Sequence, residues 1–271
     1  IRATSEVGIK FNSQLRPEFT RTLASASWSY RWTDKTRSQH RFDLLDINYI
    51  YVPWKSELFK AYLGNLTDRN SILIKSYEDQ LIVRMGYTFN YNSANASQTS
   101  SQRKSFYTLR FNMEESGNLL YGISKLIHRK PKGDKGYVIA NIPFAQYLKT
   151  DFDFAENLKI DNRNSLVFHI GMGVVYPYGN SKAVPFEKRY FSGGPNSVRG
   201  WSVRSLGPGS YKGANGAVNY INHTGDIKLD LNVEYRTHLF WKFNGALFVD
   251  AGNIWTIYEY SDQPKGQFLW N

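Results

Sequence analysis

The chain has 271 residues, no cysteine and a formal net charge of +11. Without cysteine it has neither a disulfide framework nor a thiolate metal site. Its basic residues are scattered singly, and the densest group, HRKPKGDKG at 128–136, is typical of an exposed turn, so we expect no nucleic-acid binding. Mean hydropathy is −0.49, and no apolar run reaches the ~18 residues of a spanning helix, which excludes helical but not β-barrel membrane proteins.

Alternation of apolar and polar residues is the strongest pattern along the chain. In DIKLDLNVEYR, every odd-numbered residue from Ile227 to Tyr235 is apolar and every even-numbered residue is polar. This period of two indicates strands that bury one face. It predicts nine strands, at 6–12, 23–32, 44–52, 80–91, 105–113, 145–154, 165–176, 226–236 and 244–253. Many of them have about the 9–11 residues that a tilted strand needs to cross a membrane.

A soluble two-sheet sandwich also alternates and is the main alternative fold. Three features favour a transmembrane barrel: Tyr and Trp lie near strand ends, charged residues lie well inside the strands, and connections are alternately short and long. We therefore predict an all-β, antiparallel transmembrane barrel. Its lumen is predicted to be lined by Arg84, Arg110, Lys228 and Asp230, and its lipid side by Val83, Phe111, Leu231 and Val233.

Two segments between strands have helical instead of strand spacing. The segment 53–66 predicts a short amphipathic helix that ends at Gly64. The segment 115–127 predicts a second helix, whose apolar residues are Leu119, Leu120, Ile123, Leu126 and Ile127. We expect both to be extracellular loop helices that pack on a loop face.

No catalytic, cofactor or metal site is predicted. The five histidines, His40, His128, His169, His223 and His238, are too far apart in the sequence to suggest zinc-ligand spacing. Lys149, Asp151 and Asp153 alternate along one strand, which indicates a polar strand face instead of an acid–base pair. GMGVVYPYG lies within a strand, and SGGPNSVRG lacks the ending of a phosphate-binding loop.

The stretch KRYFSGGPNSVRGW, residues 188–201, fits neither a helix nor a strand. Gly193 and Gly194 can adopt positive φ angles and Pro195 fixes one φ, so these residues predict a tight turn. The guanidinium of Arg199 can donate to two carboxylates at once. The loop therefore has both a defined turn and a side chain suited to a narrow polar lumen.

RYFSGGPNSVRGW and GALFVDAGNIW resemble the C-terminal barrel of the bacterial surface antigen family, the BamA/TamA-type outer-membrane assembly factors. The family motif V-R-G-F/Y corresponds to Val198, Arg199, Gly200 and Trp201, where Trp replaces Phe or Tyr. The family strand motif F-x-D-x-G corresponds to FVDAG, residues 248–252. The segments PFEKRYFSGG and LGPGSY are most similar to assembly factors of Bacteroidetes-type bacteria. Over residues 165–255 the resemblance rests on motifs. Over residues 1–160 it rests only on the regular succession of predicted strands.

The resemblance implies a role for the loop. In the family, a long extracellular loop folds into the lumen and its arginine pairs with an acidic residue of the strand motif. We therefore expect residues 185–210 to lie in the lumen, with Arg199 held by Asp250, Glu234 or both as a latch. The residues expected to wedge the loop or let it turn are Tyr190, Phe191, Trp201, Gly193, Gly194 and Gly200.

Family barrels have sixteen strands and follow periplasmic POTRA domains. Residues 1–271 are expected to be a partial outer-membrane barrel, roughly strands five to thirteen, with no POTRA domain in this chain. The implied function is insertion of β-barrel proteins into the bacterial outer membrane. The implied partners are outer-membrane lipid including lipopolysaccharide, unfolded barrel clients and accessory assembly subunits. Two alternatives stay open: a two-partner-type secretion pore, and a passive channel or structural barrel.

Overall fold

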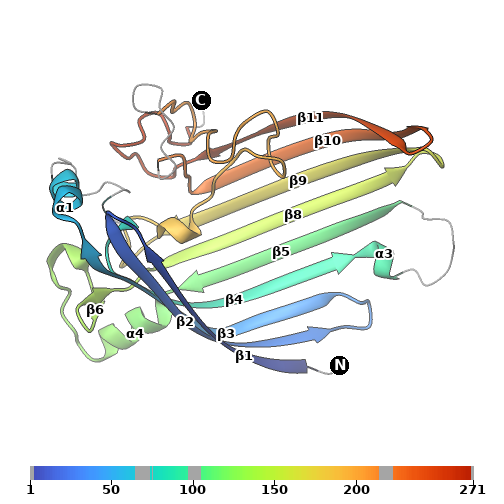
Figure 1. The fold of residues 1–271 in the computed structure, drawn as a ribbon. Coiled ribbons are helices and arrows are strands. Elements are labelled where there is room, and N and C mark those ends of the chain that lie inside the picture. Colours follow the sequence, from blue (N-terminus) through green and yellow to red (C-terminus); the bar gives the residue numbers. More distant parts are fainter. Residues whose placement is uncertain (1–2, 65–73, 75, 97–104, 214–221, 270–271) are drawn as a thin grey trace.

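The computed structural model describes residues 3–64, 74, 76–96, 105–213 and 222–269. They form one nine-stranded sheet in the order β1-β2-β3-β4-β5-β8-β9-β10-β11 (Figure 1). Every neighbouring pair in it is antiparallel. The strands are β1 (Ala3–Leu15), β2 (Phe19–Thr33), β3 (Gln39–Lys55), β4 (Gln80–Asn92), β5 (Phe106–Ser116), β8 (Tyr147–Lys159), β9 (Asn164–Pro177), β10 (Ile227–Phe240) and β11 (Phe243–Trp255). Each segment predicted from alternation is one of these strands, so the antiparallel all-β prediction is confirmed.

Short elements occupy the connections. They are α1 (Glu57–Gly64), α3 (Ser93–Ala96), α4 (Asn118–Leu126), the 3-10 turns η1 (Gly133–Lys135) and η2 (Phe186–Lys188), and the two-residue strands β6 (Val138–Ile139) and β7 (Ile142–Pro143). The two predicted helices are α1 and α4, although residues 65–66 of the first prediction lie outside the described residues. Within the described ranges, no helix has the length and apolar character needed to span a bilayer.

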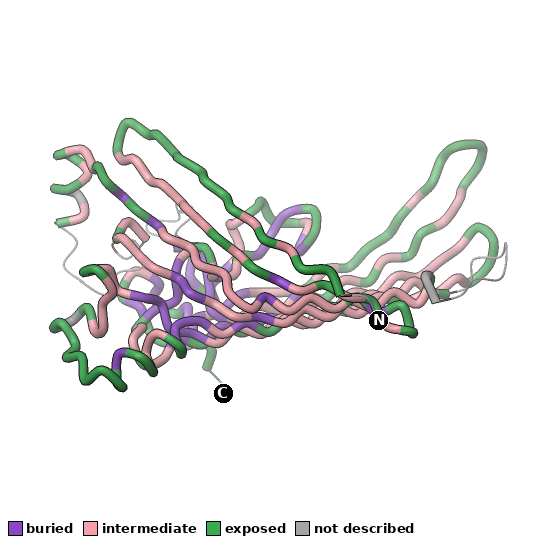
Figure 2. Tube along the Cα trace, turned by 90° about the horizontal axis from the view of Figure 1, so that it is seen from below, coloured by how far each residue is buried: buried purple, intermediate pink, exposed green. Residues whose placement is uncertain are grey.

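The sheet is curved into a trough. Figure 2, seen from below, shows hairpins at both lateral ends of the sheet rising toward the same side. Three long connections, 56–79, 117–146 and 178–226, lie at one end of the strands, called here the long-loop end (Figure 1). The turns 34–38 and 241–242 lie at the other end. The three longest connections between strands of the sheet thus share one end, as in a barrel wall that crosses a membrane.

The two faces of the sheet differ as alternation predicts. Leu231 and Val233 lie on the outer, convex face and are exposed at 38% and 41%. Arg84, Arg110 and Lys228 line a polar cavity of about 870 Å³ on the inner, concave face. Among the described residues no second large sheet covers the convex face, so the sandwich alternative is wrong.

Val83 departs from its predicted lipid exposure. It lies on the convex face but is only 9% exposed. Loop 117–146 begins and ends beside this part of β4, where the Gly117 amide donates to the Val83 carbonyl at 3.0 Å and Phe144 bridges to Leu81. The loop lies on the convex side of the sheet there (Figure 2). Alternation fixes the face of a residue but not what a distant loop places over it.

A small apolar core lies on the concave face at the long-loop end. Its buried members are Ile50, Ile82, Ala145, Tyr147, Val175 and Val184. Ile82 and Val175 occupy strand positions that elsewhere carry polar lumenal side chains. Val184 belongs to loop 178–226, so this core packs the loop against the inside of the wall.

Candidate functional site

Loop 178–226 leaves β9, folds back over the concave face and returns to β10 (Figure 1). Residues 214–221 of it lie outside the described part of the chain. Its two ends are joined by mutual backbone hydrogen bonds between Tyr190 and Gly225, each 2.9 Å. The loop is therefore closed at its base, and side chains between Glu187 and Arg199 contact the concave face of the wall.

Arg199 is held by two carboxylates of the wall. Its Nε and Nη2 donate to the two oxygens of Asp250, each at 2.7 Å, and its backbone amide donates to Asp250 Oδ2 at 3.0 Å. Its Nη1 donates to Glu234. This forked, charge-assisted geometry is stronger and more specific than a single hydrogen bond. We call Arg199, Asp250 and Glu234 the arginine latch.

The strands position the acceptors of the latch. Asp250 on β11 lies opposite Asn232 on β10, and Phe248 lies opposite Glu234. The Asn232 amide donates to Asp250 Oδ1 at 2.9 Å, which fixes that carboxylate. The Arg199 guanidinium lies 3.6 Å above the centre of the Phe248 ring, a cation–π contact. Phe248 and Asp250, two residues apart on one strand face, therefore contact the same guanidinium.

The latch is largely withdrawn from water. The side chains of Asp250 and Glu234 are exposed at 4% and 14%, and that of Arg199 at 24%. The hydrogen bonds to Asp250 raise the pKa of Arg199 above its ordinary value, so the guanidinium stays charged. Loss of the guanidinium would leave two poorly hydrated carboxylates on neighbouring strands, which is costly.

Two serines next to the latch bind a third carboxylate. Ser197 Oγ donates to Asp230 Oδ2 at 2.8 Å, and Ser192 Oγ donates to Asp230 Oδ1 at 3.3 Å. The Asn232 amide also donates to the Ser197 carbonyl at 2.7 Å. The polar face of β10 is thus a row of loop-binding groups spaced two residues apart, Asp230, Asn232 and Glu234. Its existence could be predicted from the sequence, but its partners could not.

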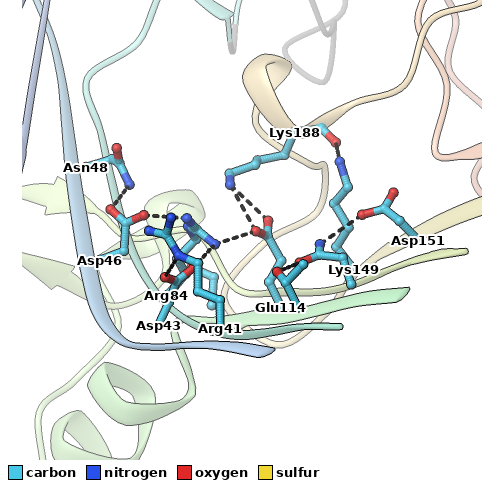
Figure 3. A network of polar contacts seen from close by, with 12 residues as sticks. Arg41, Asp43, Asp46, Asn48, Arg84, Glu114, Lys149, Asp151 and Lys188 are labelled. Atoms are coloured by element: carbon cyan, nitrogen blue, oxygen red, sulfur yellow. Dashed lines mark hydrogen bonds and ion pairs between the residues drawn. The ribbon is translucent and has the colours of Figure 1, made fainter. Parts of the chain in front are cut away.

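The opposite part of the wall holds the beginning of the loop (Figure 3). Lys188 Nζ lies 2.9 Å from Glu114 Oε1 on β5, and the Tyr190 hydroxyl donates to Asp151 Oδ1 on β8 at 2.5 Å. Arg84 Nη1 donates to the same Glu114 at 2.9 Å. We call Lys188 and Tyr190, with Glu114 and Asp151, the lysine–tyrosine anchor. The sequence did not predict this anchor, because the alternation in YLKTDFDF indicates a polar strand face without indicating which residues bind it.

A buried ion pair closes the base of the loop. Arg189 Nη1 lies 3.2 Å from Asp226 Oδ1, and both side chains are fully buried. Arg189 Nη2 also donates to the carbonyl of Thr224 at 3.1 Å and to Gln263 Oε1 at 3.2 Å. Burial raises the pKa of the Asp226 carboxyl, and the charge of Arg189 opposes this shift. The two ends of the loop and the segment after β11 are therefore joined.

Gly193 and Gly194 form the turn predicted with Pro195. Their φ angles are 97° and 94°, in the left-handed region that favours glycine. A β-carbon on Gly193 would lie 2.3 Å from the Ser202 carbonyl oxygen, so the chain also passes too close for a side chain.

Other residues of the motif differ from the expected packing. Gly200 has open space around it and no positive φ, so the structure does not require glycine there. Phe191 and Trp201 are exposed at 40% and 50% and do not wedge the loop. Among its apolar and aromatic side chains, the loop instead buries Val198, 7% exposed, and half-buries Tyr190. Trp201, the aromatic residue of V-R-G-F/Y in this chain, is thus only half-covered.

No group of three His, Asp or Glu side chains among the described residues forms a metal site. His169 instead lies between Asp153 and Asn232, at 2.8 and 2.7 Å, on the concave face. The site is therefore built from ion pairs and hydrogen bonds between a loop and a wall.

A curved antiparallel sheet with an apolar outer face, a charged inner face and a loop tied across the inside defines the wall of a transmembrane β-barrel. The sequence matches the Omp85 superfamily domain over residues 3–269, and the chain belongs to this superfamily. Its members are bacterial outer-membrane proteins, which places this chain in the outer membrane.

Two relatives illustrate the match. The outer membrane protein assembly factor BamA of Neisseria meningitidis serogroup B is 31% identical over 103 residues, which is 35% of this chain and 12% of that protein. The crystal structure of BamA from Haemophilus ducreyi lacking POTRA domains 1–3 superposes with a TM-score of 0.58 and 14% identity, covering 94% of this chain and 46% of that one. The second similarity shows the fold. The chain spans less than half the length of either relative.

Proposed function

We propose that the chain forms the loop-bearing wall of a barrel that inserts other β-barrel proteins into the outer membrane. The observation that carries this proposal is the arginine latch, a loop arginine forked onto two lumenal carboxylates. Membership of the Omp85 superfamily and similarity to a protein named as an assembly factor support it. In this proposal residues 1–271 are part of a larger barrel, and residues 185–210 are its in-folded loop.

The contacts of the loop favour assembly over passive conduction. Five strands of the concave face hold it, through the pairs Glu187–Arg21 on β2, Lys188–Glu114 on β5, Tyr190–Asp151 on β8, Ser197–Asp230 on β10 and Arg199–Asp250 on β11. A loop fixed to this many strands obstructs the lumen and braces its wall. An obstructed lumen disfavours passive conduction as the main role.

The bracing suggests how the chain contributes to insertion. The latch fixes β10 and β11 to the loop, and the lysine–tyrosine anchor fixes β5 and β8 to the same loop. Barrel shape is then maintained while client strands pair elsewhere at an exposed strand edge, by β-augmentation. The proposed partners are unfolded outer-membrane clients, accessory assembly subunits and the surrounding lipid. No bound cofactor or catalytic step is part of the proposal.

A reconstitution tests this function against secretion. The full-length protein in lipid vesicles is mixed with an urea-unfolded barrel client, and folding is followed by the shift of the folded client on an unheated gel. We expect faster client folding than in empty vesicles, and slower folding with Arg199→Ala. Transport of a soluble partner into the vesicles without faster client folding would favour the secretion pore instead.

A further inference from the structure

Helix α4 turns its apolar stripe away from the protein. Leu119, Ile123, Leu126 and Ile127 are exposed at 52%, 44%, 79% and 61%. Their spacing places them on one side of the helix, in the pattern that normally faces a core. The helix was expected to pack on a loop face, but four of its five apolar residues are exposed.

The packed side of the helix is less apolar than the exposed side. Ser124 is 1% exposed and its hydroxyl has no hydrogen-bond partner among the described residues, while Leu120 and Tyr121 are half-buried. A helix that buries a serine and exposes four large aliphatic side chains is unfavourable in water, because about 25 cal/mol is lost for each Å² of apolar surface left exposed. The orientation suits a helix whose outer side contacts an apolar medium.

The helix lies on the lipid side of the wall. It begins at Asn118, directly after β5, and the amide of its N-cap residue Gly117 donates to the carbonyl of Val83 on β4 at 3.0 Å. Val83 and Phe144, both on the convex face, are buried to 9% and 1% exposure, as expected where loop 117–146 lies against that face. In Figure 2 this part of the chain lies beyond the sheet, on the side away from the rising hairpins. The exposed stripe thus continues the apolar surface of the strands at the long-loop end.

The turn after the helix is strongly basic. Its exposed cations, with the last one of the helix, are Lys125, Arg129, Lys130, Lys132 and Lys135. None of them forms an ion pair with a carboxylate in the described part of the chain. Arg129 Nη1 donates to the Val138 carbonyl at 2.9 Å and Lys132 Nζ to Asn141 Oδ1 at 3.0 Å, which holds the turn beside the helix.

We propose that α4 and its basic turn form a lipid-docking element that lies in the outer leaflet of the membrane. The apolar stripe enters the boundary of the acyl chains, and the cations of 125–135 bind phosphate groups of anionic lipid. An amphipathic helix with basic residues beside its apolar face binds membrane surfaces in this way. The continuity with the lipid-facing strands favours lipid over a protein partner. This inference does not depend on the assembly role.

Spin labels test the position of the stripe. Residues 1–271 contain no cysteine. Once any cysteine elsewhere in the full-length protein has been replaced, one introduced cysteine carries a single label. Nitroxide labels report collisions with oxygen and with a water-soluble nickel complex. They are attached at Leu126→Cys and Lys132→Cys. The aqueous control is Thr36→Cys, in a turn at the opposite end of the strands. The protein is reconstituted in phosphatidylcholine, with and without lipid A.

We expect the oxygen-to-nickel collision ratio at position 126 to be several-fold higher than at 132 and 36. In bilayers with lipid A, adding Lys130→Glu and Lys132→Glu to Leu126→Cys should lower that ratio toward the control, with less effect in phosphatidylcholine alone. A ratio at 126 equal to that at 36 in both bilayers would overturn the proposal. So would low collisions with both reagents or dipolar broadening between labels, which would identify a protein partner or a second copy as the occupant.

Discussion

Gly252 on β11 lies directly beneath Val198 of the in-folded loop. A β-carbon at position 252 would come within 3.0 Å of Val198 Cγ2 and within 2.5 Å of the Leu229 carbonyl oxygen. Val198 is 7% exposed and precedes Arg199, while Gly252 lies two residues after Asp250. The glycine therefore leaves the space that lets the loop approach closely enough for the latch to form.

Gly252→Ala should displace the loop and weaken the latch, because the added methyl group meets the Leu229 carbonyl of β10 and the Val198 side chain of the loop. The expected result is several-fold faster proteolytic cleavage within residues 185–213 of the full-length protein in detergent. Gly245→Ala on the same strand is the matched control, since its nearest atom would be 3.4 Å away, in the Leu239 side chain. Equal cleavage rates for the two variants would contradict this account.

Arg199→Ala should release the second half of the loop while the barrel still folds. The variant loses the hydrogen bonds to Asp250 and Glu234, an expected cost of about 2–3 kcal/mol for charged partners. Arg199→Lys should recover only part of it, because an ammonium group cannot fork onto one carboxylate. Hydrogen exchange of amides 193–206 measures the release.

The control for that variant is Arg204→Ala. Arg204 belongs to the same loop but contacts the rings of Phe186 and Phe191, and none of the described carboxylates pairs with it. If removing Arg204 increased exchange as much as removing Arg199, the latch would not be the main restraint on the loop.

Lys188→Ala should loosen the first half of the loop without releasing the latch. Lys188 and Arg199 bind opposite parts of the wall, so each restrains its own segment. We expect faster exchange over 186–192 and unchanged exchange at 198–200, with both segments fast in the double variant. Equal exposure of both segments in Lys188→Ala alone would show that the two contacts are not separate restraints.

Arginine at the lipid face should be far more costly than in the lumen. Leu231→Arg should lower the free energy of unfolding in bilayers by about 2–4 kcal/mol if the site lies near the midplane. Asn90→Arg, which points into the polar cavity, should cost much less. Denaturant titration of the two variants in the same lipid measures the difference, and similar costs would contradict the assigned faces.

The strands and their faces could be predicted from the sequence because alternation is a local property. It identified every strand of the nine-stranded sheet and placed Lys228 inside and Leu231 outside the wall. The latch residues were found only because a family motif supplied the pairing. Alternation alone put Glu234 and Asp250 on the inner face without indicating their partner.

Contacts between distant segments could not be predicted in this way. Lys188 and Glu114 are separated by 74 residues, and nothing local in either segment indicates the other. Helical spacing identified α4 but not its orientation, because the spacing of apolar residues is the same in a helix that faces protein and in one that faces lipid. Trp201 was expected to anchor the loop because it is aromatic, yet the loop is fixed on the other side by Val198.

The charge swap of the latch tests the central claim most directly. Client folding rates are measured for the full-length protein with Arg199→Asp, with Asp250→Arg and with both. Each single variant places like charges together and should slow folding at least about tenfold, near the 1.4 kcal/mol that a factor of ten represents. The double variant restores opposite charges and should recover several-fold. Full activity of Arg199→Asp alone, or no recovery in the double variant while all three barrels fold, would contradict the account.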